Sequence, residues 1–554
     1  MITTILKKIS DYKTEKISLA AVILAVSYFL SFLLGLLRDR LLAAHFGAGN
    51  TLDAYYTAFR IPDFVAIVLM MGAISVALIP IFTENLLQSK EKAFSYFANL
   101  LNLFLIFLIV ICAILFLFTP ALISVIAPGF APDKKDITVQ LTRIMFLSPI
   151  LLGASNMISA VLMVFKKFLI TSIAPILYNL GSIIGILFFV PYFGVSGLAY
   201  GIILGAFMHL CIQLPALFEI GFRPKKMFLW FDKDFLLTLK LTLPRAIGLA
   251  ATQINLIIVT AIGSLLAVGS ITVFNFANDL ANPIIALLAV PFSTAVFPAL
   301  SMLATKKDTQ GFLEKFYSTF RQIIFLIIPA SALCYLLRAH LVRVVLGSGK
   351  FDWSATKLTA ACFGIFMIGL FAQGLIYLLS KSFFAIKNTF VPAMVSIISI
   401  AVLPPLAYFF IHFLARQNLF SYIVFSILRI DQVKNTVVVG LPLAISIDAI
   451  IQIILLTIFF KVNVKEFKFS KLHAFLVKVF AATVISVAVD YFIRQALGGY
   501  FGSNTLLVLF LQTVVVGFLG VGAYLVAAYV MNIEEVHELK KYLFSRLGFS
   551  HGKH

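Results

Sequence analysis

Charged residues cluster in a mostly apolar region near the N-terminus, over residues 35–82. A charge at the centre of a bilayer costs about 2.5–3.5 kcal/mol on insertion scales. Charges at this cost indicate an internal, hydrated cavity that binds a polar molecule. The cluster contains three arginines and three aspartates, namely Arg38, Asp39, Arg40, Asp53, Arg60 and Asp63.

Arginines within predicted membrane spans are the first candidates for binding, and we assign this role to Arg38, Arg60 and Arg245. A guanidinium group keeps its charge, and its planar fork of donors fits the oxygens of a phosphate. We expect Asp39 and Asp53 to hold these arginines in place when the site is empty. The alternative is that each arginine only extends to the membrane interface.

A second polar group lies further along the chain, where Asn275, Asn278, Asp279 and Asn282 recur at helical spacing. Residues three and four apart share one face of a helix, so this stripe faces a cavity or a neighbouring helix. We include Asn278 and Asp279 among the candidate binding residues. The alternative is that the stripe forms hydrogen bonds between helices.

Signatures of catalysis and of metal or nucleotide binding do not occur in the sequence. The eight histidines form no HExxH motif, and no P-loop or GxSxG motif appears. We therefore expect no enzyme activity, no metal site and no cofactor. A coupling cation, sodium or proton, is left open, with Asp448 and Asp490 as candidate sites that could equally be paired within the bundle.

The elements that position these residues are membrane helices. The chain has 554 residues, of which 62% are hydrophobic and 12% charged, far from the composition of a soluble domain. Since about 20 apolar residues make one span, we predict an all-α polytopic membrane protein with about fourteen spans. Their approximate limits are 17–38, 53–86, 93–118, 137–165, 168–191, 194–219, 235–265, 269–304, 310–345, 355–386, 389–415, 438–461, 472–495 and 503–531.

The net charge of +20 comes mainly from short loops and tails on one side of the membrane. Basic loops stay in the cytoplasm, so we predict two cytoplasmic termini, and this location of the charge removes nucleic acid as a partner. Arg38 and Arg40 lie toward the other side and break this rule, which favours a role other than topology. Segment 416–434 breaks it more weakly.

Internal similarity indicates two six-helix units. A Ser-x-Ala-x-x-Pro motif at residue 75 recurs at residue 293, and Gly-Leu at 197 recurs at 440, which places His209 opposite Gln452. An even number of spans per unit gives parallel repeats with a site between them. We predict an N-lobe over 1–222, a C-lobe over 223–465, and two further helices with a cytoplasmic tail over 466–554.

The segment LLGLLRDRLLAAHFGAGNTLDAYYTAFRIPD followed by GAISVALIPIF resembles the MurJ/MviN family, the lipid II flippases of peptidoglycan synthesis. Further similarity lies at 243–260, 277–301 and 347–356. The resemblance implies fourteen helices, with two six-helix lobes around a central cavity and a lipid-tail groove formed by the last two helices. It also implies that Arg38 and Asp39 match the Arg-Asp pair of the family's cavity, and that Asp53 matches its loop aspartate.

Several positions depart from the family pattern. Asp279, or Asn278 beside it, stands where an arginine is expected, and Val259 stands where some members have a sodium-binding aspartate. Retained ligands therefore do not support sodium coupling. Two interpretations of the missing positive charge are open: Arg60 and Arg245 supply it from new positions, or the substrate differs. The other departures are Phe32, Ala66 and Met71, where many members carry charged residues.

The resemblance favours a flippase of the bacterial cytoplasmic membrane that moves undecaprenyl-diphosphate-linked lipid II to the outer leaflet. Alternating access driven by the membrane potential is the expected mechanism. Expected partners are this lipid-linked diphosphate sugar, the bilayer and cell-wall synthesis proteins. The alternatives are a MATE-like exporter of another lipid-linked oligosaccharide or of small cationic compounds, a membrane-embedded enzyme, and a scaffold.

Overall fold

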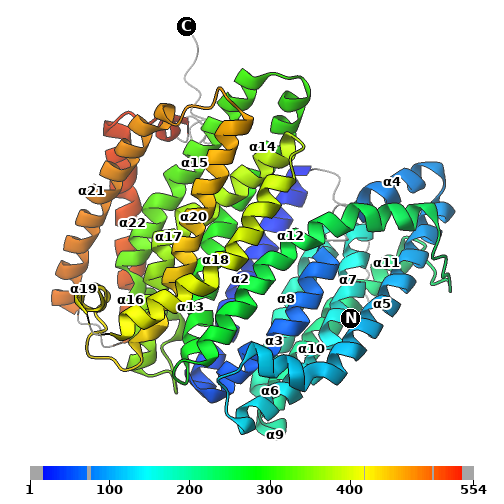
Figure 1. Cartoon of the computed structure of the whole chain (residues 1–554), viewed down its shortest axis with the longest axis horizontal. Helices are drawn as coiled ribbons and strands as arrows, with labels where there is room; N and C mark the ends of the chain where they lie inside the picture. Colours follow the sequence, from blue (N-terminus) through cyan, green and yellow to red (C-terminus); the bar gives the residue numbers. More distant parts are fainter. Residues whose placement is uncertain (1–16, 72–76, 417, 502–504, 539–554) are drawn as a thin grey trace. The chain divides into compact units, whose positions relative to one another are not determined.

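The computed structural model describes residues 17–71, 77–416, 418–501 and 505–538, and every regular element in these ranges is a helix (Figure 1). Within these ranges, eleven helices are long and apolar enough to cross a membrane. They coincide with the third to sixth and the eighth to fourteenth predicted spans. The all-α polytopic class is therefore confirmed.

The three other predicted spans correspond to α2, to α3 with α4, and to α12. Two of these regions, α2 and α3, carry the N-terminal charges, and the apolar part of α12, Gly248–Ser264, is shorter than a full span. These three regions carry most of the candidate site residues.

The chain folds into two compact units. The first contains Met1–Thr272 together with Ser348–Phe351. Its helices include a π-helical stretch, η1, directly after α3. The helices of this unit are α2 (Ile17–Phe46), α3 (Asn50–Val65), η1 (Ala66–Met71), α4 (Ile79–Gln88), α5 (Lys90–Ile126), α6 (Pro132–Met145), α7 (Leu147–Val164), α8 (Phe168–Ile184), η3 (Gly185–Phe189), α9 (Val190–Phe193), α10 (Ser196–Cys211), α11 (Leu214–Glu219) and α12 (Lys233–Ser264).

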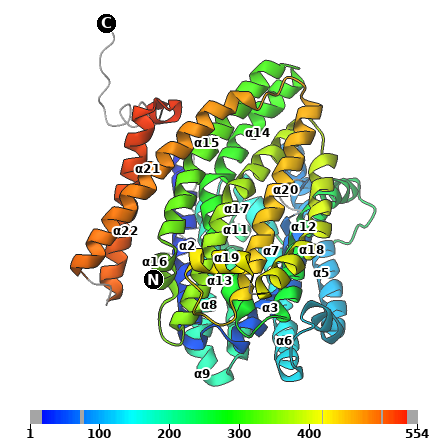
Figure 2. The ribbon, with the colours of Figure 1, turned by 60° about the vertical axis from the view of Figure 1, so that its left-hand side comes forward.

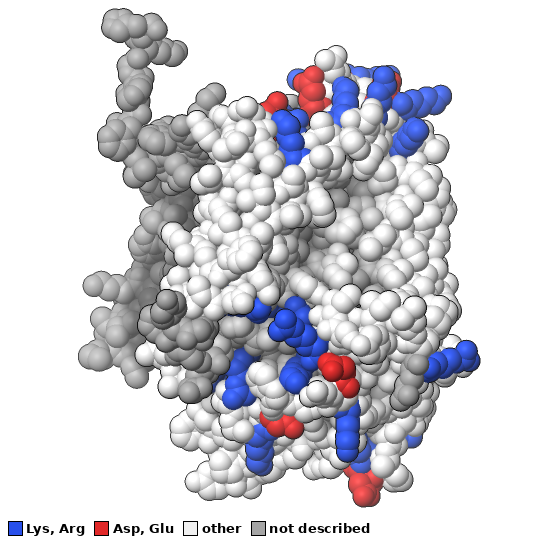
Figure 3. All heavy atoms as spheres, turned by 90° about the vertical axis from the view of Figure 1, so that its left-hand side faces the viewer, with Lys and Arg blue, Asp and Glu red and all other residues white. Residues whose placement is uncertain are grey.

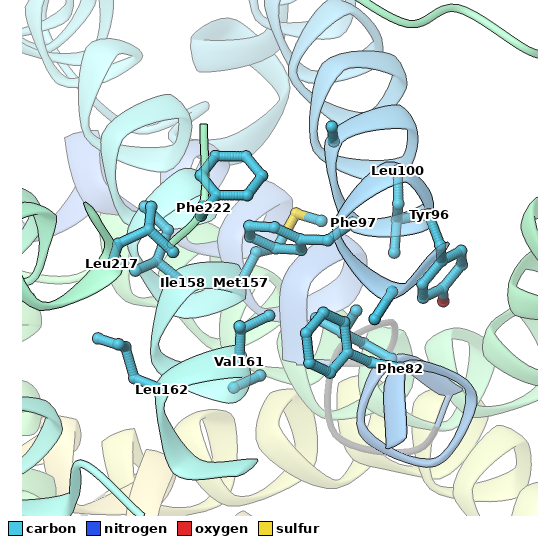
Figure 4. Close-up of a cluster of buried hydrophobic side chains, with 14 of the residues drawn as sticks. Phe82, Tyr96, Phe97, Leu100, Met157, Ile158, Val161, Leu162, Leu217 and Phe222 are labelled. Carbon is cyan, nitrogen blue, oxygen red and sulfur yellow. The ribbon is translucent and has the colours of Figure 1, made fainter. Parts of the chain in front are cut away.

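Aromatic and aliphatic side chains of α4, α5, α7 and the segment after α11 form a dense core in this unit (Figure 4). Phe97 is fully buried and meets Phe82 and Phe222 edge-on, with ring centroids 6.2 and 5.1 Å apart. Edge-to-face aromatic pairs add about 0.5–1.5 kcal/mol beyond the burial of their area. This core fixes the helices at one end of the unit.

Glycines bring α8 and α10 into close backbone contact. A Cβ atom at Gly181 would overlap the backbone of Gly205, and one at Gly201 would overlap Gly185. Small residues at such positions let helices approach closely where no hydrophobic driving force acts between them. The α8–α10 pair is therefore a firm support for α2, which packs against α8.

The second unit contains Val273–Gly347 and Asp352–His554. Its first helix, α13, begins three residues earlier, within the first unit. The helices of this unit are α13 (Ser270–Leu288), α14 (Val290–Thr305), α15 (Thr309–Leu336), α16 (Arg338–Leu346), α17 (Trp353–Ala385), α18 (Phe390–Ala415), α19 (Leu419–Leu428), η4 (Thr436–Val439), α20 (Gly440–Asn463), α21 (Ser470–Phe501) and α22 (Leu506–Val530).

The last two helices, α21 and α22, lie side by side (Figure 2). Ser486 on α21 donates to the carbonyl of Gly520 on α22 over 2.7 Å, and Tyr524 of α22 donates to the Phe325 carbonyl of α15 over 2.9 Å. The pair is therefore tied to the rest of the second unit by buried polar contacts. The predicted division at 222 and 465 stays a prediction, and the structure groups α12 with the first unit.

Candidate functional site

The best-formed polar contact of the site joins neighbours on α2. Arg38 Nε and Nη2 both donate to Asp39 Oδ1, at 3.0 and 2.8 Å. The Asp39 side chain is only 6% exposed, whereas that of Arg38 is 24% exposed. Asp39 therefore anchors a guanidinium group that still reaches open space, as the sequence predicts for this pair.

Arg60 lies on α3 and is 8% exposed. Its Nε donates to Thr260 Oγ1 of α12 over 2.7 Å, which fixes the guanidinium group against a helix 200 residues away in sequence. The charges of Arg60 and Arg38 both act on the carboxylate of Asp63, which lies further along α3. The structure thus places the two arginines close enough to Asp63 for both charges to act on its carboxylate.

Two tyrosines complete this neighbourhood, and sequence reasoning missed both. Tyr55 of α3 is 4% exposed, and its hydroxyl interacts electrostatically with Arg38, Asp39 and Asp63. The hydroxyl of Tyr178 on α8 also interacts electrostatically with Arg38 and Asp63. A phenol offers both a donor and an acceptor, so these hydroxyls suit a polar ligand. Among eighteen tyrosines, nothing in the sequence distinguishes these two.

Asp53 belongs to a different cluster, at the start of α3. Its Oδ2 accepts from Lys134 Nζ and from the Gly269 amide, at 2.9 and 2.8 Å. Its Oδ1 accepts from the amide and the hydroxyl of Thr272, at 2.9 and 2.7 Å. The expectation that Asp53 holds an arginine is therefore wrong, because a lysine of α6 and the start of α13 take both of its oxygens.

The backbone around Asp53 is tightly constrained. Gly269 has a φ of +88°, and a Cβ atom there would overlap the carbonyl of Ala48, so this position requires glycine. A cavity of about 380 Å³ lies beside the cluster and is lined by Asn50, Thr51, Asp53, Gly129, Phe130, Ala131, Asp133, Lys134, Ile137, Gly263, Ser264, Leu266, Ala267 and Val268. Asp53 therefore has a structural role beside this cavity, where it joins α3 to α6 and to the start of α13.

The remaining candidates lie elsewhere. Asn278 and Asp279 are partly exposed on α13 and belong to the second unit. Arg245 is on α12, but its side chain lies outside the described residues. Ala66, where the family carries a charge, is the first residue of η1, and Val259 is 2% exposed. Neither of these two side chains can supply charge to the site.

Buried polar clusters also occur on α10 and α20, at the helices that the repeat relates. In the first unit Ser155 Oγ lies 2.7 Å from His209 Nδ1. In the second unit Ser399 donates to Asp448 Oδ2 over 2.6 Å, and Gln452 Nε2 donates to the same oxygen over 2.8 Å. No group of three or more histidine, cysteine or acidic side chains in the described residues could hold a metal ion.

The chemistry of the Arg38–Arg60 neighbourhood is that of anion exchange. The charges of two guanidinium groups, those of Arg38 and Arg60, act on one carboxylate, that of Asp63. An incoming anion with several oxygens can replace the carboxylate as their partner, since charge-assisted and bidentate contacts are the strong ones. A phosphate or diphosphate fits this description.

Comparisons with known proteins identify the family of this chain. The family model described as "Lipid II flippase MurJ" matches residues 42–511. A probable lipid II flippase MurJ of Buchnera aphidicola subsp. Acyrthosiphon pisum is 29% identical over 376 residues, 67% of this chain and 74% of that protein. The lipid II flippase MurJ of Burkholderia cenocepacia is 28% identical over 388 residues, 68% of this chain and 75% of that protein.

Solved structures show the same fold. A lipid II flippase MurJ in an inward closed conformation matches with a TM-score of 0.70 at 22% identity, covering 92% of this chain and 98% of that one. An inward-facing multidrug resistance MATE transporter of the MOP superfamily matches with a TM-score of 0.63 at 14% identity, covering 80% and 98%. The fold is thus shared between flippases and drug exporters, and the residues of the site must distinguish them.

Proposed function

Because the chain belongs to the MurJ lipid II flippase family, we propose that it moves lipid II from the inner to the outer leaflet by alternating access. The diphosphate of lipid II binds Arg38 and Arg60, while the prenyl tail stays in the lipid. The family is one of transporters, which fits the absence of catalytic motifs from the sequence.

The observation that carries this assignment is the shared counter-charge of the two arginines. The charges of Arg38 and Arg60 both act on Asp63, and Asp39 keeps Arg38 oriented over 2.8 Å. A diphosphate brings about two negative charges and displaces the carboxylate from the guanidinium groups. Release then needs only the return of Asp63 to the same two partners. Cationic substrates would meet repulsion at this place, which favours lipid II over the exporter alternative.

The direction of transport follows from the distribution of basic residues. Lysine and arginine in short loops mark the cytoplasmic side, so both termini are cytoplasmic, and lipid II enters from the inner leaflet. An inside-negative potential then favours outward movement of the diphosphate, by up to about 2.3 kcal/mol per charge per 100 mV. Transport driven by the membrane potential requires no nucleotide hydrolysis. Asp448 is the candidate for a coupling proton or cation, and cell-wall synthesis proteins are the expected partners.

Complementation of a bacterium depleted of its own lipid II flippase tests this function. The unaltered chain restores growth, and Arg38→Ala abolishes it because the anchored guanidinium is lost. Arg223→Ala is the matched control, since Arg223 is exposed in a loop of the same unit and its removal leaves growth intact. Normal growth with Arg38→Ala at equal protein level would overturn the role of Arg38, and failure of the unaltered chain would overturn the function itself.

A further inference from the structure

Three arginines gather in the second unit, far along the chain from the site described above. Arg338 begins α16, Arg429 follows α19, and Arg494 lies on α21. The charges of Arg429 and Arg494 both act on Arg338, that of Arg429 also acts on Arg494, and that of Arg494 acts on His340. Three separate elements therefore bring like charges close enough to repel one another.

Arg338 is held in place by neutral groups. Its Nη1 donates to the carbonyl of Tyr335 over 2.9 Å, and its Nη2 donates to the carbonyl of Ile427 over 3.0 Å. The guanidinium group also stacks over the ring of Tyr335, 4.4 Å from the ring centroid. The contact with Ile427 ties α16 to the end of α19, directly before Arg429. The charge of Arg338 is therefore positioned without being neutralised.

Acidic side chains do not neutralise the cluster. In the described part of the chain, no ion pair within 4.0 Å joins Arg338, Arg429 or Arg494 to a carboxylate. Asp490, one turn before Arg494, is fully buried, and a Cβ atom at Gly520 of α22 would overlap its carboxylate. Its side chain therefore points into the α21–α22 contact.

The ends of the membrane helices place the cluster at one boundary of the predicted spans. Arg338 lies two residues after the end of α15, and Arg494 lies toward the end of α21, so both lie at the membrane side opposite the start of α21. Exposed aromatic side chains surround this level, with Trp353 55%, Tyr422 68% and Tyr491 43% exposed. Tryptophan and tyrosine mark membrane interfaces. Figure 3 shows Lys and Arg side chains toward both ends of one face, with an uncharged band between them.

We propose that Arg338, Arg429 and Arg494 form a binding site for the phosphate of an anionic membrane lipid in the extracytoplasmic leaflet. Repulsion among the three guanidinium groups is relieved when a phosphate lies between them, and each group offers donors to its oxygens. The lipid's acyl chains lie along the exposed apolar surface of α21 and α22, where Phe492 and Phe518 are 69% and 80% exposed.

This site also explains the basic residues of segment 416–434, which break the topology rule. Basic residues are normally kept from extracytoplasmic loops, and Arg429 is retained there because it binds an anion. The three arginines of this site belong to the second unit, whereas Arg38 and Arg60 belong to the first.

Native mass spectrometry of the full-length protein, titrated with phosphatidylglycerol, tests the proposal. The triple variant Arg338→Ala, Arg429→Ala, Arg494→Ala is expected to bind the lipid at least fivefold more weakly. The matched control replaces Lys306, Lys307 and Lys315, three exposed basic residues of the same unit, with alanine and keeps full affinity. Equal loss in both variants, or none in either, would overturn the site.

Two further measurements separate the alternatives. Inorganic phosphate at millimolar concentration should not displace the lipid, and displacement would identify a site for the free anion. The single variant Arg429→Ala removes an exposed side chain and should weaken lipid binding about threefold with an unchanged melting temperature. An unchanged affinity in this folded variant would argue against the cluster even if the triple variant failed to fold.

Discussion

Two aspartates of α3, Asp53 and Asp63, have the same chemistry and opposite surroundings. Four donors from Lys134, Gly269 and Thr272 saturate both oxygens of Asp53, which is 2% exposed. Asp63 is only partly buried and faces the charges of Arg38 and Arg60. A saturated carboxylate holds a structure together, whereas a carboxylate that balances guanidinium charges can be exchanged for a ligand.

The largest expected effect is the loss of stability on replacing Asp53, the aspartate whose oxygens are both saturated. Asp53→Ala leaves the partly buried Lys134 without its partner, and removal of one member of a buried ion pair costs up to about 3–5 kcal/mol. We expect a melting temperature several degrees lower in detergent and a smaller yield of folded protein. Thermal unfolding followed by intrinsic fluorescence measures this change.

The double variant Asp53→Asn, Lys134→Met provides the control. The amide still accepts from Thr272, and no unpaired charge remains, so most of the lost stability should return. If Asp53→Ala melted like the unaltered protein, the structural role of Asp53 would be refuted.

Whether the sequence could predict the partners of each aspartate depends on how far apart they lie in the chain. The Arg38–Asp39 pair joins neighbours in the chain, so the sequence shows both partners together, whereas the geometry of their contact comes from the structure. Asp53 meets Lys134 across 81 residues and Thr272 across 219, and half of its donors are backbone amides, which leave no trace in residue types. Its assignment to an arginine failed for that reason.

Membrane helices could be predicted because twenty apolar residues in a row have one stable arrangement in lipid. The pairing of Arg60 with Thr260 could not, since threonine is common in membrane helices and its partner lies 200 residues away. Asp63 was visible in the charged cluster but was not assigned to the site, because only the fold brings it within reach of the charges of two arginines.

A smaller effect is expected from replacing Asp63, the aspartate proposed to exchange with the ligand. Asp63→Asn removes the counter-charge that competes with the diphosphate, so lipid II should bind about tenfold more tightly, equivalent to about 1.4 kcal/mol. Because the carboxylate no longer displaces the ligand, the rate of flipping should fall. Equilibrium binding and a proteoliposome assay with labelled lipid II measure the two quantities.

The opposite directions of these two changes make the test specific. A variant that is merely misfolded would lose both affinity and rate. Weaker lipid II binding by Asp63→Asn at an unchanged melting temperature would mean that Asp63 contacts the substrate directly, and the exchange mechanism would then be discarded.

The smallest expected effect concerns the orientation of Arg60. Thr260→Val keeps the side-chain shape but removes the acceptor that fixes Arg60 Nε at 2.7 Å, a loss of about 1 kcal/mol. Lipid II affinity should fall about fivefold, with little change in Tm, because Arg60 keeps its charge and loses only its alignment. Thr260→Ser retains the hydroxyl and should restore most of the affinity. If serine and valine behaved alike, the methyl group rather than the hydrogen bond would be the relevant contact, and α12 would serve only to pack against α3.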